Sequence, residues 1–231
     1  DDAASDEPAE SPLAWYQMFR SSNYGFEKAE ILTGNVGYLD LMASVPTHYA
    51  GPTAVAALNF IGDTDAVIID LRENNGGNVS MVQFLASHFF DPLDPVVLNT
   101  FISRETDYPK ESQSLSFAPA GARIDTPVYI LVSSRTASAA EAFAYTMQAH
   151  GRAIIVGETT RGAANPGVWL YVGDGFVLFL SNRSSRHPIT ETNWEGTGVK
   201  PDLSAPEGTA HSHALADIYV ALLKTGPAPD R

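Results

Sequence analysis

Three short runs of apolar residues constrain the fold of this chain more than any other feature. They are DAVIIDL (65–71), PVYILV (127–132) and RAIIVGE (152–158). Uninterrupted apolar runs of this length are typical of strands that are buried on both faces. Segments with helical spacing, SMVQFLASHFF (80–90) and SSRTASAAEAFAYTMQAHG (133–151), lie between them. Alternating buried strands and helices predict a layered α/β domain.

The rest of the chain adds two hairpins, a strand and two helices to this core. GFEKAEIL (25–32) and VGYLDLM (36–42) alternate around a Gly-Asn turn, which predicts a hairpin. The other predicted elements are a helix over TAVAALNFI (53–61), a strand over PVVLNTFI (95–102), a second hairpin over VWLYV (168–172) and FVLFLS (176–181), and a closing helix over LADIYVALLK (215–224). Ordinary core packing is the favoured explanation for the apolar second hairpin. Residues 104–126 are polar, and we expect them to be irregular.

A single core domain is predicted over residues 21–231, because no Pro/Gly/Ser-rich linker separates two cores. It follows an acidic leader, residues 1–20, of which residues 1–12 are expected to be disordered. Within the leader, Leu13–Phe19 is a short apolar segment that we expect to form a helix against the core.

Composition excludes several classes of function. The formal net charge of -13 disfavours nucleic acid and anionic membrane surfaces as partners. The chain has no cysteine, which excludes disulfides, thiol nucleophiles and thiolate metal sites. No apolar run reaches the roughly 18 residues that span a bilayer, so no integral membrane segment is expected. The six histidines lack a spacing such as HExxH, and we expect no metal or organic cofactor.

Ser138 is the first candidate for chemistry, because it lies where a buried strand breaks into a helix, within SSRTASAAE (133–141). Free backbone N–H groups at a helix start stabilise negative charge, and the amide of Ala139 is a natural donor to an oxyanion. The competing explanation is that Ser138 or Thr136 only caps the helix.

Three other turns follow buried strands or carry a carboxylate. DLRENNGG (70–77) brings glycine amides to the end of the first buried strand, where a ligand can approach the backbone closely. GETTRG (157–162) follows the third, and NWEGTGVKPD (193–202) places Glu195 between a tryptophan and a glycine. Each of these turns alone is ordinary, since turns of this kind are common and a lone glutamate is usually solvated.

The order of these four segments resembles peptidase family S41, the tail-specific or C-terminal-processing serine peptidases. The resemblance covers about residues 25–205, and WEGTGVKPD and LTGNVGYLDL are most similar to the interphotoreceptor retinoid-binding protein-like and tricorn-like branch. It implies a ClpP/crotonase-like core of β-β-α units with an N-terminal β-hairpin, and a peptide or unfolded protein as substrate. Many relatives carry a PDZ domain, but the stretch between residues 42 and 65 is too short for one, so no PDZ domain is expected. Relatives are often exported, so an extracytoplasmic location, periplasmic or secreted, is expected.

The resemblance also assigns roles to residues of this chain. Ser138 takes the place of the nucleophile, and Ala139 with Gly76 or Gly77 takes the place of the oxyanion-hole donors. The lysine that serves as base in the common branch is replaced by Ala163, and its supporting glutamine by Gly167. In the tricorn-like branch a late glutamate corresponds to Glu195.

A serine hydroxyl needs a base, and several side chains are candidates. His187 and Glu195 are the first, because they lie near each other in sequence. His48 is another histidine that tertiary structure can bring close, and Asp40, at the position of the tricorn-like histidine, qualifies if burial raises its pKa. His150 ends the helix that Ser138 begins, roughly 18 Å away, which is too far.

Three functions remain open at this stage. The first is a serine endopeptidase or carboxy-terminal processing peptidase that forms an acyl-enzyme at Ser138. The second is a peptidase fold without a base that binds a peptide or an apolar small ligand, such as a retinoid or fatty acid. The third, ranked last, is crotonase-like chemistry on an acyl thioester, which only the pair of amides supports.

Overall fold

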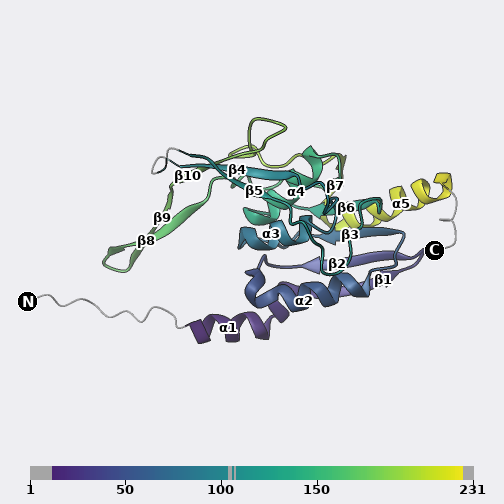
Figure 1. Ribbon diagram of the computed structural model, residues 1–231, viewed down its shortest axis with the longest axis horizontal. Helices are drawn as coiled ribbons and strands as arrows, with labels where there is room; N and C mark the ends of the chain where they lie inside the picture. Colours follow the sequence, from purple (N-terminus) through teal and green to yellow (C-terminus); the bar gives the residue numbers. More distant parts are fainter. Residues whose placement is uncertain (1–11, 104–105, 107, 226–231) are drawn as a thin grey trace, which may run out of the picture.

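The computed structural model describes residues 12–103, 106 and 108–225. Its centre is a six-stranded sheet with the strand order β1-β2-β3-β6-β7-β11 (Figure 1). The strands are β1 (Phe26–Leu32), β2 (Val36–Leu41), β3 (Ala66–Asp70), β6 (Val128–Val132), β7 (Ile154–Gly157) and β11 (Leu203–Ser204). β1 and β2 pair antiparallel, and every other neighbouring pair is parallel.

Two hydrophobic cores lie on the two faces of this sheet. One face packs against the helices α2 (Thr47–Phe60), α3 (Val79–Ala86) and α4 (Ala139–Ala149). The other packs against α5 (Glu207–Thr225). Side chains alternate along a strand, so Ile69 belongs to the first core and Ile68 to the second. This is why β3 up to Ile69, β6 and β7 lack charged residues.

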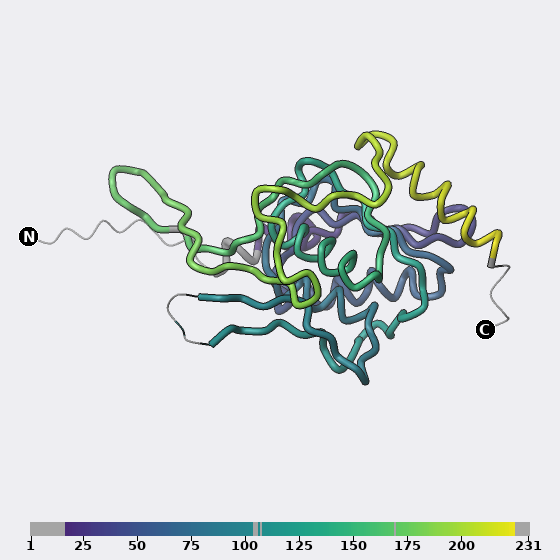
Figure 2. The backbone as a smooth tube through the Cα atoms, turned by 90° about the horizontal axis from the view of Figure 1, so that it is seen from above, coloured from purple at the N-terminus to yellow at the C-terminus, as the bar shows by residue number. Residues whose placement is uncertain are grey.

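Two smaller sheets extend from the core. The strands β4 (Val97–Ser103), β5 (Lys110–Gln113) and β10 (Arg183–Arg186) form an antiparallel sheet in the order β10-β4-β5. It is joined to α4 by Thr146, whose hydroxyl donates to Leu98 O at 3.1 Å. The strands β8 (Gly167–Gly173) and β9 (Phe176–Ser181) form a hairpin that projects from the body of the molecule (Figures 1 and 2).

Parallel pairing brings the carboxyl ends of three buried strands to one edge of the sheet. β3 ends at Asp70, β6 at Val132 and β7 at Gly157. The turns that follow them, 71–78, 133–138 and 158–166, therefore lie next to one another. Ligands of parallel α/β sheets bind at this edge, so the fold itself positions the candidate site.

The structure confirms the predicted buried strands and both hairpins and corrects several details. The helix expected at 53–61 begins earlier, at Thr47, and the closing helix begins at Glu207. β5 lies in the stretch expected to be irregular, while β10 and β11 were not predicted. The β8–β9 hairpin is not packed in the core, since the apolar side chains of β9 are exposed.

The N-terminal prediction is covered only in part. Residues 1–11 lie outside the described residues. Pro12–Ser21 forms helix α1, and Phe19 packs against the first core, while Asn23–Gly25 forms a short 3-10 helix, η1. Among residues 12–225, with the gaps given above, no helix is long and apolar enough to cross a bilayer.

Candidate active site

Ser138 holds a backbone conformation that an ordinary helix cap does not need. It is the N-cap residue of α4, with φ 52° and ψ -118°. A cap usually lies in the β region, and a positive φ in a residue with a Cβ costs on the order of 1–3 kcal/mol. The Ser138 hydroxyl does not meet the geometry of a cap hydrogen bond, although the residue lies in a capping box with Glu141. Strain of this kind is common at active sites and favours the functional explanation.

The carboxylate of Glu141 holds the backbone around Ser138 in place. Glu141 is fully buried. It accepts hydrogen bonds from Ser138 N at 2.8 Å, Thr160 Oγ1 at 2.5 Å, Gly162 N at 2.6 Å and Ala163 N at 2.9 Å. An ionised acceptor makes such bonds about twice as strong as neutral ones. One carboxylate thus joins the start of α4 to the turn after β7.

The glycine turn after β3 lies directly against Ser138. A Cβ placed on Gly76 would come within 2.7 Å of Ser138 Cβ and 3.1 Å of Ala139 N. The φ of Gly76 is 102°, so space and backbone conformation both require glycine. Gly77 instead faces Ser44, whose carbonyl oxygen would lie 2.3 Å from an added Cβ. The structure therefore brings Gly76, Ser138 and Ala139 together, with Gly77 one residue further along.

Buried Asn74 orients this turn and determines which glycine amide is free. Its Nδ2 donates to Leu41 O at 2.8 Å, and its Oδ1 accepts from Gly76 N at 2.8 Å. The Gly76 amide is therefore occupied. Among the described residues, no acceptor is found for the amides of Gly77 and Ala139. These two N–H groups are the available donors to an oxyanion.

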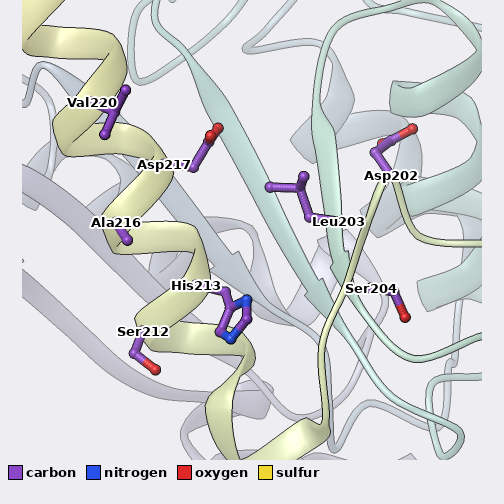
Figure 3. Close-up of a pocket in the computed structure, with 8 residues that line it drawn as sticks. All are labelled: Asp202, Leu203, Ser204, Ser212, His213, Ala216, Asp217 and Val220. Carbon is purple, nitrogen blue, oxygen red and sulfur yellow. The ribbon is translucent and has the colours of Figure 1, made fainter.

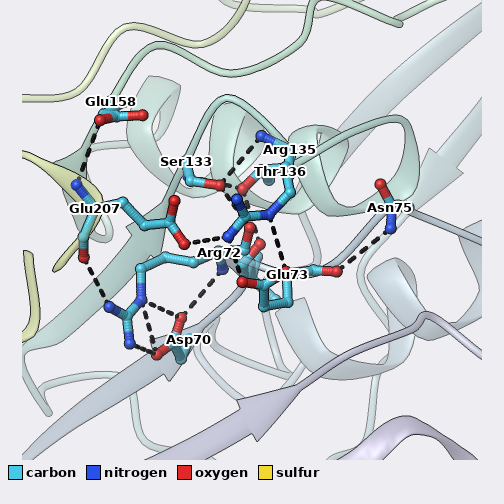
Figure 4. A network of polar contacts seen from close by, with 10 residues as sticks. Asp70, Arg72, Glu73, Asn75, Ser133, Arg135, Thr136, Glu158 and Glu207 are labelled. Carbon is cyan, nitrogen blue, oxygen red and sulfur yellow. Dashed lines mark hydrogen bonds and ion pairs between the residues drawn. The ribbon is translucent and has the colours of Figure 1, made fainter.

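Further hydrogen bonds hold the two turns together (Figure 4). The hydroxyls of Ser133 and Thr136 donate to Arg72 O and Leu71 O at 2.5 and 2.8 Å. Beside them, Arg72 donates to both carboxylate oxygens of Asp70. Arg135 pairs with Glu73 and Glu207, but its side chain is 46% exposed, and exposed pairs contribute little stability. The buried hydroxyls therefore position the turns more than the surface charges do.

Asp40 lies at the same edge of the sheet, opposite Asp70 in the register of β2 and β3. Burial, then the nearby carboxylates of Asp70 and Glu27, raise the pKa of Asp40 to about 6. Because side chains alternate along β2, Asp40 lies on the face of Tyr38, which packs in the α5-side core. Ser138 begins α4, which packs on the other face. Asp40 has the raised pKa of a candidate base but lies across the sheet from the α4 core.

Glu195 holds the loop that follows the Glu141 contacts. Its carboxylate accepts from Ala164 N at 2.7 Å and from Asn165 N at 2.9 Å. Two carboxylates therefore hold the loop around Ala163. Glu141 accepts from the amides of Gly162 and Ala163, and Glu195 accepts from the two amides that follow. The hydrogen bonds of Glu195 reach this loop and not Ser138.

The structure does not place His187 at Ser138. His187 is fully buried and packs edge-on against the rings of Tyr145 and His150, with centroids 5.5 and 5.2 Å away. These residues follow Ser138 by seven and twelve positions along α4, roughly 10 and 18 Å at a helical rise. Burial, and then His150, lower the pKa of His187 to about 4. The described ring contacts of His187 thus lie further along α4 than Ser138, and its role as the base stays a prediction.

The other histidine candidate, His48, lies near the start of α2. It is exposed and stacks on Tyr49 at 3.9 Å between centroids. Among the described residues, the hydrogen bonds at Ser138 involve one titratable side chain, that of Glu141. Glu141 and Asn74 lie within the sequence motifs, but the motifs alone do not indicate their roles. Their signal was a carboxylate three residues after an N-cap and an amide just before paired glycines.

A cavity of about 330 Å³ adjoins the glycine turn. It is lined by Phe19, Ala43, Ser44, Val45, Pro46, Gly76, Gly77 and Asn78. A second cavity, of about 260 Å³, lies between α3 and the β10-β4-β5 sheet, and Pro166 and Arg183 line part of it. A substrate bound at Ser138 therefore has hollows on the glycine-turn side and near the 163–166 loop.

A larger cavity, of about 570 Å³, lies elsewhere, between α5 and the segment that carries β11 (Figure 3). Its lining includes Asp202, Ser204, His213 and Asp217, and no residue of the three turns at the sheet edge. It is therefore not part of the site around Ser138.

Comparison with known proteins agrees with this geometry. The profile of peptidase family S41 matches residues 35–205. The chain is 28% identical over 184 residues to the carboxyl-terminal-processing peptidase 1, chloroplastic, of Arabidopsis thaliana, covering 78% of this chain and 35% of the relative. It is 28% identical over 150 residues to the carboxyl-terminal-processing peptidase 3, chloroplastic, of the same plant, covering 65% and 28%. The chain thus spans about a third of the length of these relatives.

Two solved structures share the fold. The photosystem II D1 C-terminal processing protease aligns with a TM-score of 0.61 at 20% identity, covering 79% of this chain and 46% of that one. Mature CPAF aligns with a TM-score of 0.68 at 14% identity, covering 84% and 52%. At this identity the structures show a common fold.

Replacing Glu141 by glutamine is expected to loosen the site. The amide group of glutamine would face backbone donors, so at least one buried N–H loses its acceptor. We expect Glu141→Gln to lower the free energy of unfolding by about 2–4 kcal/mol, measured by urea denaturation. Glu30→Gln, at the edge strand β1, is the control: its side chain is 41% exposed and pairs with the exposed Lys28, so it should change the free energy by under about 0.5 kcal/mol. Equal effects of the two variants would contradict the role of Glu141.

Asp40 is expected to make stability depend on pH. Its pKa in the folded state, about 6, lies above the usual 3.8, so the folded state favours the protonated form. That stabilisation is fully present below about pH 4 and is lost as pH rises through 6. We expect Asp40→Asn to raise the free energy of unfolding at pH 8 by about 1–2 kcal/mol, reduced from the full shift because the group is partly solvated. The gain should vanish at pH 4, and the exposed Asp125→Asn should show no such gain. A gain of Asp40→Asn that is equal at both pH values would contradict this assignment.

Proposed function

Because the chain belongs to peptidase family S41, we propose that it is a serine peptidase with Ser138 as its nucleophile. The observation that carries the proposal is the strained backbone of Ser138 beside Gly76, next to the unoccupied amides of Ala139 and Gly77. A simple helix cap needs neither the strain nor the paired donors. A nucleophile needs both exposure of its hydroxyl and stabilisation of the oxyanion.

The proposed reaction is acyl transfer to serine. The Ser138 oxygen attacks the carbonyl carbon of the scissile peptide bond and gives its proton to a base. Negative charge on the carbonyl oxygen is stabilised by the N–H groups of Ala139 and Gly77. Collapse of the intermediate breaks the C–N bond, the amine leaves with a proton, and water then hydrolyses the ester to release the acid and restore the serine.

Glu195 is proposed as a positioning residue for this reaction. Its carboxylate holds the amides of Ala164 and Asn165, so it orients the loop that carries Ala163, the position of the family lysine. Glu141 holds the other side of the same loop. Together they orient this loop as a platform from which a base would reach Ser138.

We propose peptides or unfolded chain ends as substrates and a location outside the cytoplasm. The cavity beside Gly76 and Gly77 has apolar walls, Phe19 and Val45 among them, which suits an apolar side chain next to the scissile bond. Two of the named relatives are carboxyl-terminal-processing peptidases, and both are chloroplastic.

A second candidate function is binding without turnover, and Ala163 is the observation that favours it. With alanine at the position of the lysine, the described contacts of Ser138 include no base apart from Glu141, whose oxygens already accept four hydrogen bonds. Such a domain would bind a peptide, or an apolar ligand such as a retinoid or fatty acid, and release it unchanged.

Labelling by a fluorophosphonate tests the nucleophile directly. We expect the chain to be labelled and Ser138→Ala to lose at least about 100-fold of the rate, because the serine oxygen forms the bond to phosphorus. Ser212→Ala, in exposed α5, is the control and should be labelled like the parent chain. Labelling that survives Ser138→Ala would refute the assignment, and a chain that is never labelled but binds peptide saturably would favour the second candidate.

Restoring a lysine tests whether a base is missing. Ala163 N lies 2.9 Å from the carboxylate that also binds Ser138 N, so a lysine side chain at 163 is long enough to reach the hydroxyl. We expect Ala163→Lys to raise the labelling rate at least about tenfold, the lower range for a general base. Ala163→Met, of similar length without the amine, should leave the rate unchanged. If both variants slow labelling equally, a base already acts from elsewhere and the loop position is not vacant.

A further inference from the structure

The β8–β9 hairpin exposes apolar side chains on both of its faces. The pairing register places Val168 opposite Leu180 and Leu170 opposite Leu178, which form one face. Tyr171 pairs with Val177 on the other. Among the described residues, β8 and β9 pack extensively against each other, and neither packs extensively against another helix or strand. Figures 1 and 2 show the hairpin projecting away from the body from two directions.

A hairpin exposed to water normally alternates apolar and polar residues, and this one does not. Leu178 and Leu180 are 48% and 47% exposed, while Phe176 reaches 70%. The only charged residue between 163 and 182 is Asp174, although charged residues make up 18% of the chain. Aromatic residues without charges are typical of the centre of a protein–protein interface.

We propose that this hairpin is the interface between two copies of the chain. Nine apolar residues of the hairpin are each 40–70% exposed. They are Val168, Leu170, Tyr171, Val172, Phe176, Val177, Leu178, Phe179 and Leu180. For side chains of this size they present on the order of 800–900 Å². A partner that covers both faces of the hairpin would bury the roughly 800 Å² that each partner contributes to a standard interface, and a partner that covers one face would bury about half of it. A second copy supplies the same surface, so a two-fold arrangement buries both hairpins at once.

Charges at the two ends of the hairpin specify how the copies align. Asp174 lies at the tip and Arg183 at the base, where β10 begins, and both are exposed. Among the described residues neither forms an ion pair. The tip and base are roughly 25 Å apart along the strand. When two hairpins pack antiparallel about a two-fold axis, Asp174 of each copy meets Arg183 of the other.

Charge also distinguishes this occupant from a membrane surface. The net charge of -13 repels an anionic bilayer as a whole. It repels a second copy as well, but the uncharged hairpin keeps the acidic bodies apart and adds two pairs of opposite charge. Compared with a membrane surface, a second copy fits the hairpin better, because Asp174 and Arg183 of one copy can pair with Arg183 and Asp174 of the other.

Analytical ultracentrifugation of the whole chain tests the proposal. From about 1 to 100 μM we expect a reversible dimer of twice the 24.8 kDa chain mass. Leu178→Lys should weaken association at least about tenfold, because it places a charge in the interface. Ile31→Lys is the matched control, since Ile31 lies on a strand and is 49% exposed against 48% for Leu178. It should leave the dimer unchanged.

A double-mutant cycle tests the antiparallel alignment. Asp174→Asn keeps a residue that tolerates the positive φ of 52° at the tip, and Arg183→Gln keeps the side-chain length. Each should weaken the dimer about three- to tenfold, and the double variant should be no weaker than either single one, because the second change then removes nothing. Additive losses would overturn the pairing of tip and base.

Other results would overturn the proposal altogether. A chain that stays monomeric at the highest concentration, or a dimer that Leu178→Lys leaves intact, would do so. So would a monomer that cosediments with phosphatidylcholine vesicles, or quenches retinol fluorescence, and loses that ability in Leu178→Lys. These measurements do not involve Ser138, so their outcome is independent of whether the chain is a peptidase.

Discussion

The buried carboxylate of Glu141 is the interaction on which the arrangement of the site depends. It accepts four hydrogen bonds from residues of two turns that are far apart in sequence. A buried charge is tolerated only when donors surround it, so Ser138, Thr160, Gly162 and Ala163 must all keep their places. The strained conformation of Ser138 is stable because this contact and the close approach of Gly76 leave it little room to relax.

The parallel sheet provides the frame in which such a contact can form. Because β3, β6 and β7 run in the same direction, their turns meet at one edge. Hydrogen bonds from the buried hydroxyls of Ser133 and Thr136 then join the turn after β6 to the turn after β3. Asn74 uses its amide to hold the glycine turn, which leaves the Gly77 N–H free. Hydrogen bonds thus connect the turns at the sheet edge with the residues that position the Gly77 N–H group.

Ala163 shows that the backbone arrangement of the site and its capacity for catalysis are separate questions. The structure holds Ser138 beside two amides that have no acceptor among the described residues, and the loop that carries Ala163 is held by the carboxylates of Glu141 and Glu195. Whether a peptide bond is cleaved depends on a proton acceptor, which is a property of side chains rather than of the fold.

Much of this protein was determined by the sequence alone. Runs of apolar residues predicted the buried strands because burial on both faces leaves no polar position. The TASAAE and DLRENNGG motifs located Ser138, Ala139 and the glycine turn through their resemblance to family S41, and the positive φ of Gly76 explains the glycine there. Tertiary structure decided the rest. It placed His187 beside His150 instead of Ser138, assigned Glu141 to a role that its motif did not reveal, and left the β8–β9 hairpin exposed. An apolar sequence pattern indicates that a strand or helix has a face to bury. Which distant segment packs on that face depends on the tertiary structure.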